Sequence, residues 1–105
     1  MPRLPKSYER FQKKYRDLWT AYDQLGGAVH RAGPLDEKTR ELVKLGIAVG
    51  AQLEGAVHSH TRKALDAGAS AVEIRQVALL AIPTIGFPTT MAALTWIEDV
   101  LKKKP

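Results

Sequence analysis

The chain has 105 residues, of which 45% are hydrophobic and 26% are charged. This length and composition fit a single globular domain over residues 1–105 and leave no room for a second one. The absence of cysteine excludes disulfides, thiolate catalysis and cysteine metal sites. It agrees with a reducing compartment, and we expect a cytoplasmic protein.

The net charge of +5 is located at the two ends of the chain. Residues 1–16 carry a net charge of +5, the lysines at 102–104 add three charges, and residues 17–101 have a net charge of −3. Charged ends of this kind are usually solvated. We therefore do not expect a nucleic-acid partner.

The first predicted element is a helix over residues 7–26, with Ser7 as its N-cap and Gly26-Gly27 as its end. Its apolar residues recur at steps of three and four, the spacing of a packed seam: Tyr8, Phe11, Tyr15, Leu18, Tyr22 and Leu25. A second helix is predicted from its cap at Asp36 to about residue 52.

A third helix is predicted over residues 55–67, with Gly68 behind it as a typical C-terminal residue. Ser70 and Glu73 form a capping-box pattern that opens a fourth helix, and Pro83 ends or kinks that helix. Pro88 suits the first turn of a last helix, which extends to about residue 102.

Residues 77–97 contain no charged side chain. A membrane span is not expected, because Pro83, Gly86 and Pro88 interrupt the segment. Two buried helices joined by a turn explain it better, and another subunit can cover part of their surface. The sequence thus predicts an all-α domain of about five helices.

The polar residues that can carry chemistry lie between residues 41 and 61. On a helix over 55–67, His60 falls on the apolar stripe, whereas His58 falls on the polar stripe with Glu54 and Arg62. Because the two histidines do not share a face, they cannot chelate one ion together, and we expect no metal site.

The pattern alone leaves two interpretations of His60, a hydrogen-bonded core histidine or a general acid/base. Glu41, considered alone, is typical of a surface acid near a helix start that pairs with Lys44. His58, with Glu54 and Arg62, is typical of an exposed row of ion pairs.

Three segments together resemble the carboxymuconolactone decarboxylase-like family, which includes alkyl hydroperoxidase D. They are the sequence KTREL at 38–42, HTRKALDAGA at 60–69, and GFP at 86–88 followed by AAL at 92–94. The resemblance covers roughly residues 35–101 and leaves out the N-terminal seam helix over 7–26. It implies an alkyl hydroperoxidase D-like core of helical hairpins, usually assembled as trimers or hexamers.

The peroxidase branch of this family uses a glutamate, a Cys-x-x-Cys pair and a histidine. In this chain the glutamate corresponds to Glu41 and the histidine to His60, but the cysteine positions hold Leu53 and Ala56. Attack on a peroxide needs a thiolate, so we do not expect peroxidase activity.

The decarboxylase branch works without cysteine and without a cofactor. The resemblance implies that His60 protonates the carbon that loses carbon dioxide, and that Glu41 orients His60. Arg40 or Arg62 is a candidate for binding a substrate carboxylate, and His58 is a further candidate for binding the substrate. Two functions remain open: a cofactor-free lyase acting on a small carboxylated or lactone substrate, and a non-catalytic oligomeric binding or assembly protein.

Overall fold

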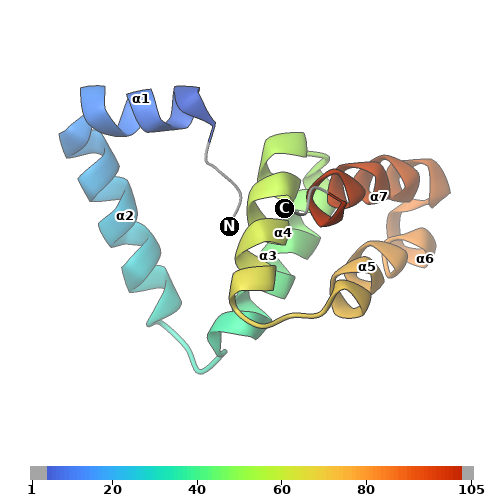
Figure 1. Cartoon of the computed structure of the whole chain (residues 1–105). Coiled ribbons are helices and arrows are strands. Elements are labelled where there is room, and N and C mark those ends of the chain that lie inside the picture. The colour runs from blue at the N-terminus through green and yellow to red at the C-terminus, as the bar shows by residue number, and fades with distance from the viewer. Residues whose placement is uncertain (1–4, 103–105) are drawn as a thin grey trace. The chain divides into compact units, whose positions relative to one another are not determined.

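The computed structural model describes residues 5–102, and all regular structure within this range is helical (Figure 1). This confirms the predicted fold class. Seven helices occur in the described range instead of about five, because two of the predicted helices are each divided. The chain separates into two compact units, Met1–Leu35 and Asp36–Pro105, and folding as one domain stays a prediction.

The first unit contains α1 (Lys6–Lys14) and α2 (Arg16–His30). The prediction of one helix over 7–26 is wrong at both its middle and its end. The chain bends at Tyr15, where Tyr8 packs edge-on against Trp19 with ring centroids 5.3 Å apart. In a straight helix two residues eleven positions apart would lie about 16 Å apart along the axis. The ring contact therefore requires the bend.

The helix also continues through Gly26 and Gly27, where a stop was predicted. Glycine inside a helix costs only about 1 kcal/mol relative to alanine. The carbonyl of Gly27 still accepts a hydrogen bond from the N–H of Arg31, at 3.1 Å.

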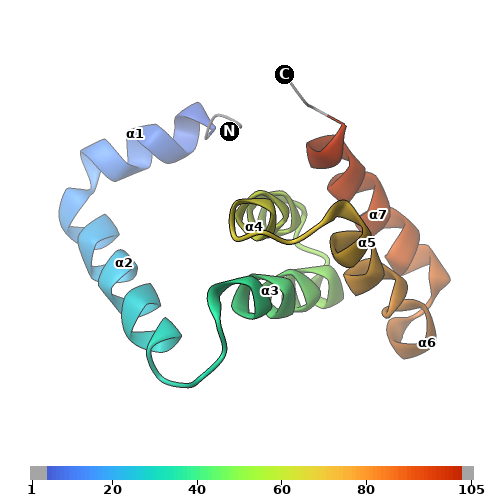
Figure 2. The ribbon, with the colours of Figure 1, turned by 60° about the horizontal axis from the view of Figure 1, so that its bottom comes forward.

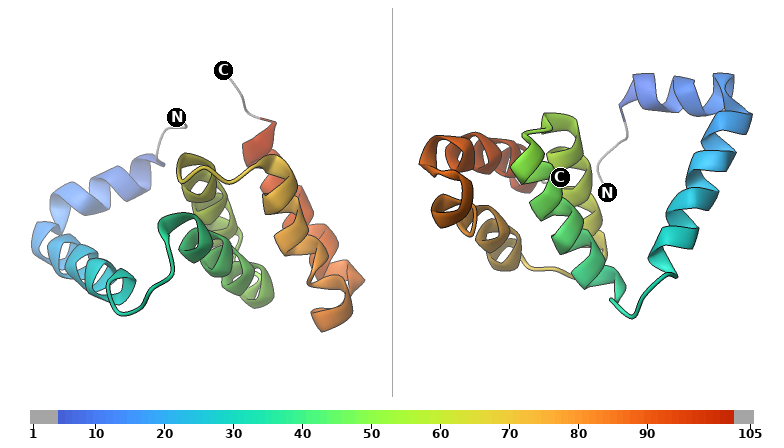
Figure 3. Two further views of the ribbon diagram at one scale, coloured as in Figure 1. Left: turned by 90° about the horizontal axis from the view of Figure 1, so that it is seen from below. Right: turned by 180° about the vertical axis from the view of Figure 1, so that it is seen from behind.

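The second unit is built from two helical hairpins. Helices α3 (Glu37–Ala51) and α4 (Glu54–Asp66) run antiparallel, side by side (Figure 2). Helices α5 (Ala71–Leu79), α6 (Ile82–Ile85) and α7 (Phe87–Leu101) form the second hairpin, with the short α6 at its bend (Figure 3). The core between them is made of buried side chains from four helices: Leu45, Val49, Val57, Ala64, Ile74, Ala78, Ala93 and Ile97.

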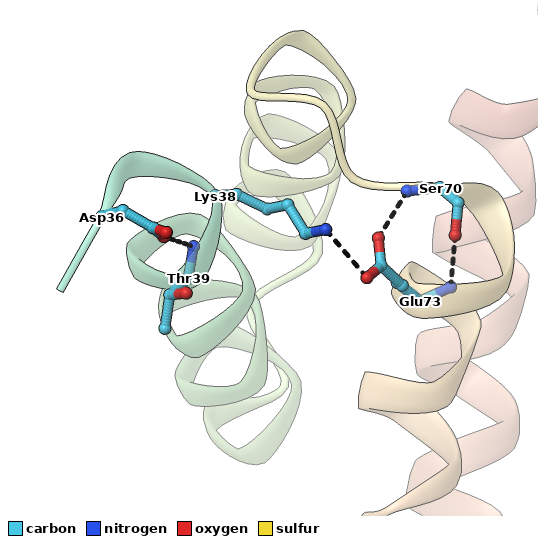
Figure 4. A network of polar contacts seen from close by, with 5 residues as sticks. All are labelled: Asp36, Lys38, Thr39, Ser70 and Glu73. Atoms are coloured by element: carbon cyan, nitrogen blue, oxygen red, sulfur yellow. Dashed lines mark hydrogen bonds and ion pairs between the residues drawn. The ribbon is translucent and has the colours of Figure 1, made fainter.

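The predicted bounds of these helices are confirmed to within a few residues, and Pro83 divides the fourth predicted helix into α5 and α6. The caps explain this agreement (Figure 4). The Asp36 carboxylate accepts the N–H of Thr39 at 2.9 Å. Ser70 and Glu73 form the reciprocal capping box, with hydrogen bonds of 2.9 and 3.0 Å.

Glu73 also binds Lys38 at 2.9 Å, which connects the first turn of α5 to the first turn of α3 (Figure 4). Hydrogen bonds from the backbone of Ser70, and then from Lys38, hold the pKa of Glu73 below its usual value. A cap predicted from local sequence thus also contributes to the packing of two helices.

The link between α3 and α4 consists of Gln52 and Leu53. Gln52 has a φ of 56°, in the left-handed region. Its side-chain amide donates to the carbonyls of Val49, at 3.0 Å, and of Thr89, at 3.2 Å. This residue therefore both turns the first hairpin and ties it to α7.

Among the helices of the described residues, none has the length and apolar character needed to cross a bilayer. The uncharged segment over 77–97 instead forms the end of α5, all of α6 and most of α7.

Candidate active site

The first hairpin brings Glu41 and His60 together. Glu41 lies in the second turn of α3, and His60 lies in the middle of α4. Atom Nδ1 of His60 is 2.9 Å from atom Oε1 of Glu41. The predicted approach of these two side chains across antiparallel helices is confirmed. Their catalytic role stays a prediction.

Both side chains of this pair are largely removed from solvent. The exposed fraction is 6% for the Glu41 side chain and 17% for the His60 side chain. The interpretation of Glu41 as a surface acid is therefore wrong. That interpretation considered α3 as an isolated helix, whereas α4 covers this part of α3.

Burial lowers the pKa of His60 below its ordinary value, and the hydrogen bond that the ring donates to Glu41 opposes this shift without cancelling it. At neutral pH the imidazole is therefore neutral. A neutral ring whose Nδ1 lies beside a carboxylate carries its proton on Nδ1, and this N–H donates a hydrogen bond to Glu41. Atom Nε2 then holds a lone pair, and it has no hydrogen-bond partner among residues 5–102.

Two lysines add positive charge around this pair. Atom Nζ of Lys44 lies 3.8 Å from the second carboxylate oxygen of Glu41, as the sequence predicted. Lys63 lies one turn beyond His60, and both lysines contribute to lowering the pKa of His60. Sequence reasoning missed Lys63, although its position three residues after His60 was a usable signal.

Arg40 and Arg62 do not share a helix face with the pair. Arg40 directly precedes Glu41 on α3, and Arg62 follows His60 by two residues on α4. Such offsets turn a side chain by about 100° and 200° around the helix. Both residues are half-buried. Their proposed binding of a carboxylate stays a prediction.

His58 belongs to a different surface of α4. Its Nε2 lies 3.0 Å from a carboxylate oxygen of Asp99 on α7, and its side chain is 26% exposed. The interpretation of His58 as part of an exposed row of ion pairs with Glu54 and Arg62 did not include this partner. Asp99 lies 41 residues further along the chain, a separation that no helical period reveals. Glu54, His58 and Asp99 are also the group of candidate metal ligands in the described part of the chain.

An apolar groove of about 430 Å³ lies between α3 and the α5–α6 segment. Its lining includes Leu42, Val43, Val77, Leu80 and Ile85. Glu41 and His60 are not among its lining residues, so the groove and the polar pair are separate features of the second unit.

Comparison with known proteins extends these observations. The sequence model of the carboxymuconolactone decarboxylase family matches residues 16–99, so the match begins at α2 and not at α3. An uncharacterized protein from Haemophilus influenzae is 38% identical over 61 residues, covering 58% of this chain and 54% of that protein. The chain thus spans about half the length of this relative.

A solved structure shares the fold. It is a carboxymuconolactone decarboxylase family protein from Legionella pneumophila, with a TM-score of 0.78 and 27% sequence identity. The similarity covers 92% of this chain and 87% of that one. The all-α fold, the family match over most of the chain and the absence of cysteine agree with one another. The chain belongs to the carboxymuconolactone decarboxylase family, in a branch without the Cys-x-x-Cys pair.

Proposed function

We propose that this protein is a cofactor-free carbon–carbon lyase that acts on a small carboxylated or lactone substrate, with His60 as general acid/base. The buried pair of Glu41 and His60 carries the proposal. Each of these two buried side chains has the other as its hydrogen-bond partner. Atom Nε2 of the imidazole is left available for proton transfer.

In this reaction the bond between a carbon and its carboxylate breaks, and the bonding electrons stay on the carbon. A neighbouring carbonyl of the substrate accepts them as an enolate. Carbon dioxide leaves, and a proton on Nε2 of His60 moves to the carbon. The resting ring is neutral, with its proton on Nδ1, so Nε2 first takes a proton from the solvent, and this is the one proton that the overall reaction consumes. The Glu41 carboxylate holds the ring and stabilises the imidazolium that forms.

The charges near the pair favour an anionic substrate. Lys44 and Lys63 place positive charge near His60, and positive charge attracts a carboxylate. Binding of that carboxylate would also raise the pKa of His60, because a negative charge favours the imidazolium. Arg40 and Arg62 remain further candidates for holding the substrate, whereas His58 faces Asp99 on a different surface of α4 and is no longer proposed for this role. With no cysteine in the chain, we place the reaction in the cytoplasm.

Proton transfer to carbon can be tested before the natural substrate is known. The full chain is incubated in D₂O with small lactone carboxylates and 3-oxo acids, and NMR follows carbon dioxide release and deuterium incorporation at the carbon next to the carbonyl. We expect turnover with the natural chain and a loss of at least about a hundredfold with His60→Gln.

His30→Gln is the matched control, because it removes a histidine from the other compact unit. It should leave turnover unchanged. Equal turnover by the natural chain and His60→Gln would contradict the proposal. The proposal would also be contradicted if compounds of this class bind, as shown by a higher melting temperature of the protein, but none of them gains deuterium.

The apolar groove favours a second candidate function, an oligomeric binding or assembly protein. Val43 is 47% exposed and Leu80 is 60% exposed on this groove. Apolar surface of this kind is commonly covered by another subunit. We propose self-association as a trimer or hexamer, which is compatible with either function.

A further inference from the structure

We propose that Glu54, His58 and Asp99 form a binding site for a divalent transition-metal ion, separate from Glu41 and His60. Each of the three residues offers one ligand atom, and these atoms all lie within 4.8 Å of one another. Two of them, His58 Nε2 and Asp99 Oδ2, are 3.0 Å apart. The site does not depend on the proposed lyase function.

The distances fit a metal ion. A zinc ion binds imidazole nitrogen and carboxylate oxygen at about 2.0–2.2 Å. Neighbouring ligands in a tetrahedral site are therefore about 3.3–3.5 Å apart. The separation of 3.0 Å between His58 and Asp99 is slightly shorter than that value, and all the ligand atoms lie within 4.8 Å of one another. Small side-chain rotations can therefore bring the three atoms around one ion, and Glu54 is exposed and has room to rotate.

Two helices hold the ligands in place. Glu54 and His58 are four residues apart on α4, and therefore on one face. Asp99 lies near the end of α7. Val57 on α4 and Ile97 on α7, next to His58 and near Asp99 in sequence, are completely buried in the shared core. The backbone that carries the ligands is thus fixed by packing and not by the ligands themselves.

The charge of the group also favours a cation. Two carboxylates meet one imidazole, and no lysine or arginine ion pair neutralises Glu54 or Asp99 within the described residues. An imidazole with two carboxylates suits ions such as Zn²⁺, Co²⁺ and Mn²⁺ better than Mg²⁺ or Ca²⁺, which prefer oxygen ligands alone. With three protein ligands, water can fill the remaining positions.

The test uses the full chain after dialysis against a chelator. Zn²⁺ binding is measured by calorimetry at physiological ionic strength, and Co²⁺ is added separately because its visible absorption reports coordination by nitrogen and oxygen. We expect one ion per chain with micromolar or tighter affinity, and a melting temperature that rises with Zn²⁺ concentration.

Three variants remove one ligand each while keeping its approximate shape: Glu54→Gln, His58→Gln and Asp99→Asn. Each should weaken Zn²⁺ binding by about tenfold or more. Two control variants should bind Zn²⁺ as the natural chain does. They are His30→Gln and Asp66→Asn, the second of which removes an exposed carboxylate at the other end of α4. Circular dichroism without metal establishes that each variant is folded.

Affinity weaker than micromolar would overturn the proposal. The same holds if Glu54→Gln and Asp99→Asn both bind Zn²⁺ as tightly as the natural chain, because the ion would then be held by other groups.

Discussion

The imidazole of His60 and the carboxylate of Glu41 meet at 2.9 Å, although the residues are 19 positions apart and lie on different helices. Glu41 is almost fully buried and His60 has burial as the main cause of its lowered pKa. The carboxylate therefore works against the desolvation of the ring, and this balance can be measured.

Replacing Glu41 by Gln keeps an oxygen that can accept the Nδ1 proton but removes the negative charge. Because the Glu41 hydrogen bond and charge both raise the pKa of His60, the variant should show a still lower value. Protonated His60 would then be rarer, and turnover should fall by about tenfold or more. NMR titration of the His60 ring protons checks the pKa. An unchanged pKa in Glu41→Gln would mean that the charge does not act on the ring.

His60 should also make stability depend on pH. Its pKa is lower in the folded chain than in the unfolded chain, where it is about 6.5. The unfolded state therefore binds more protons as pH falls below about 6.5, and the fold loses stability until the folded pKa is reached. Above about pH 6.5 the contribution is complete.

Urea unfolding above and below about pH 6.5 measures this effect. The free energy of unfolding should decrease less at acid pH in His60→Gln than in the natural chain. Identical pH dependence in the two proteins would show that His60 is not desolvated in solution.

The capping box at the start of α5 should carry measurable stability. Ser70→Ala removes the hydroxyl that accepts the Glu73 N–H and should cost about 1 kcal/mol in the free energy of unfolding. Urea unfolding provides the value. Ser59→Ala, inside α4, is a matched control that should cost little, because alanine favours a helix more than serine does. A loss of similar size in both variants would argue against the cap.

Self-association through the apolar groove can be tested with charged substitutions. Leu80→Glu places a carboxylate on the groove lining and should shift the protein toward its monomer mass of 11.6 kDa. Val72→Glu, at a residue that is 74% exposed and outside the lining, should not. Light scattering at micromolar concentration separates the two outcomes. A monomeric natural chain would rule out the proposed oligomer.

The natural chain should reduce no peroxide with dithiol donors, because it contains no cysteine. The double substitution Leu53→Cys with Ala56→Cys would place two thiols at the beginning of α4. The helix dipole there lowers a thiol pKa, so alkylation of the variant should persist below the pH at which free cysteine reacts. Peroxide turnover by the metal-free natural chain would contradict the thiolate requirement.

Local sequence predicted the parts of this fold that depend on local interactions. The Asp36 cap and the Ser70–Glu73 box are formed by residues three apart, so their patterns specify them. The inward direction of His60 also followed from one helix. The burial of Glu41 did not, because α4 provides it. The pairing of Glu41 with His60 was predicted only from the family resemblance.

The features that were not predicted depend in the same way on contacts between distant parts of the chain. The bend at Tyr15 accompanies a contact between Tyr8 and Trp19, two side chains that a straight helix would hold far apart. Asp99 reaches His58 through the packing of α7 on α4. Neither relationship leaves a periodic trace, so a three-dimensional structure was needed to find them.

The two-residue link at Gln52 and Leu53 fixes the rotational phase of α4. One inserted residue would turn that helix by about 100° and advance it by about 1.5 Å. His60 would then lose Glu41, and His58 would lose Asp99 in the same step. We therefore expect relatives that keep both contacts to keep the spacing from Glu41 to His60 free of insertions and deletions, even where the intervening residues differ.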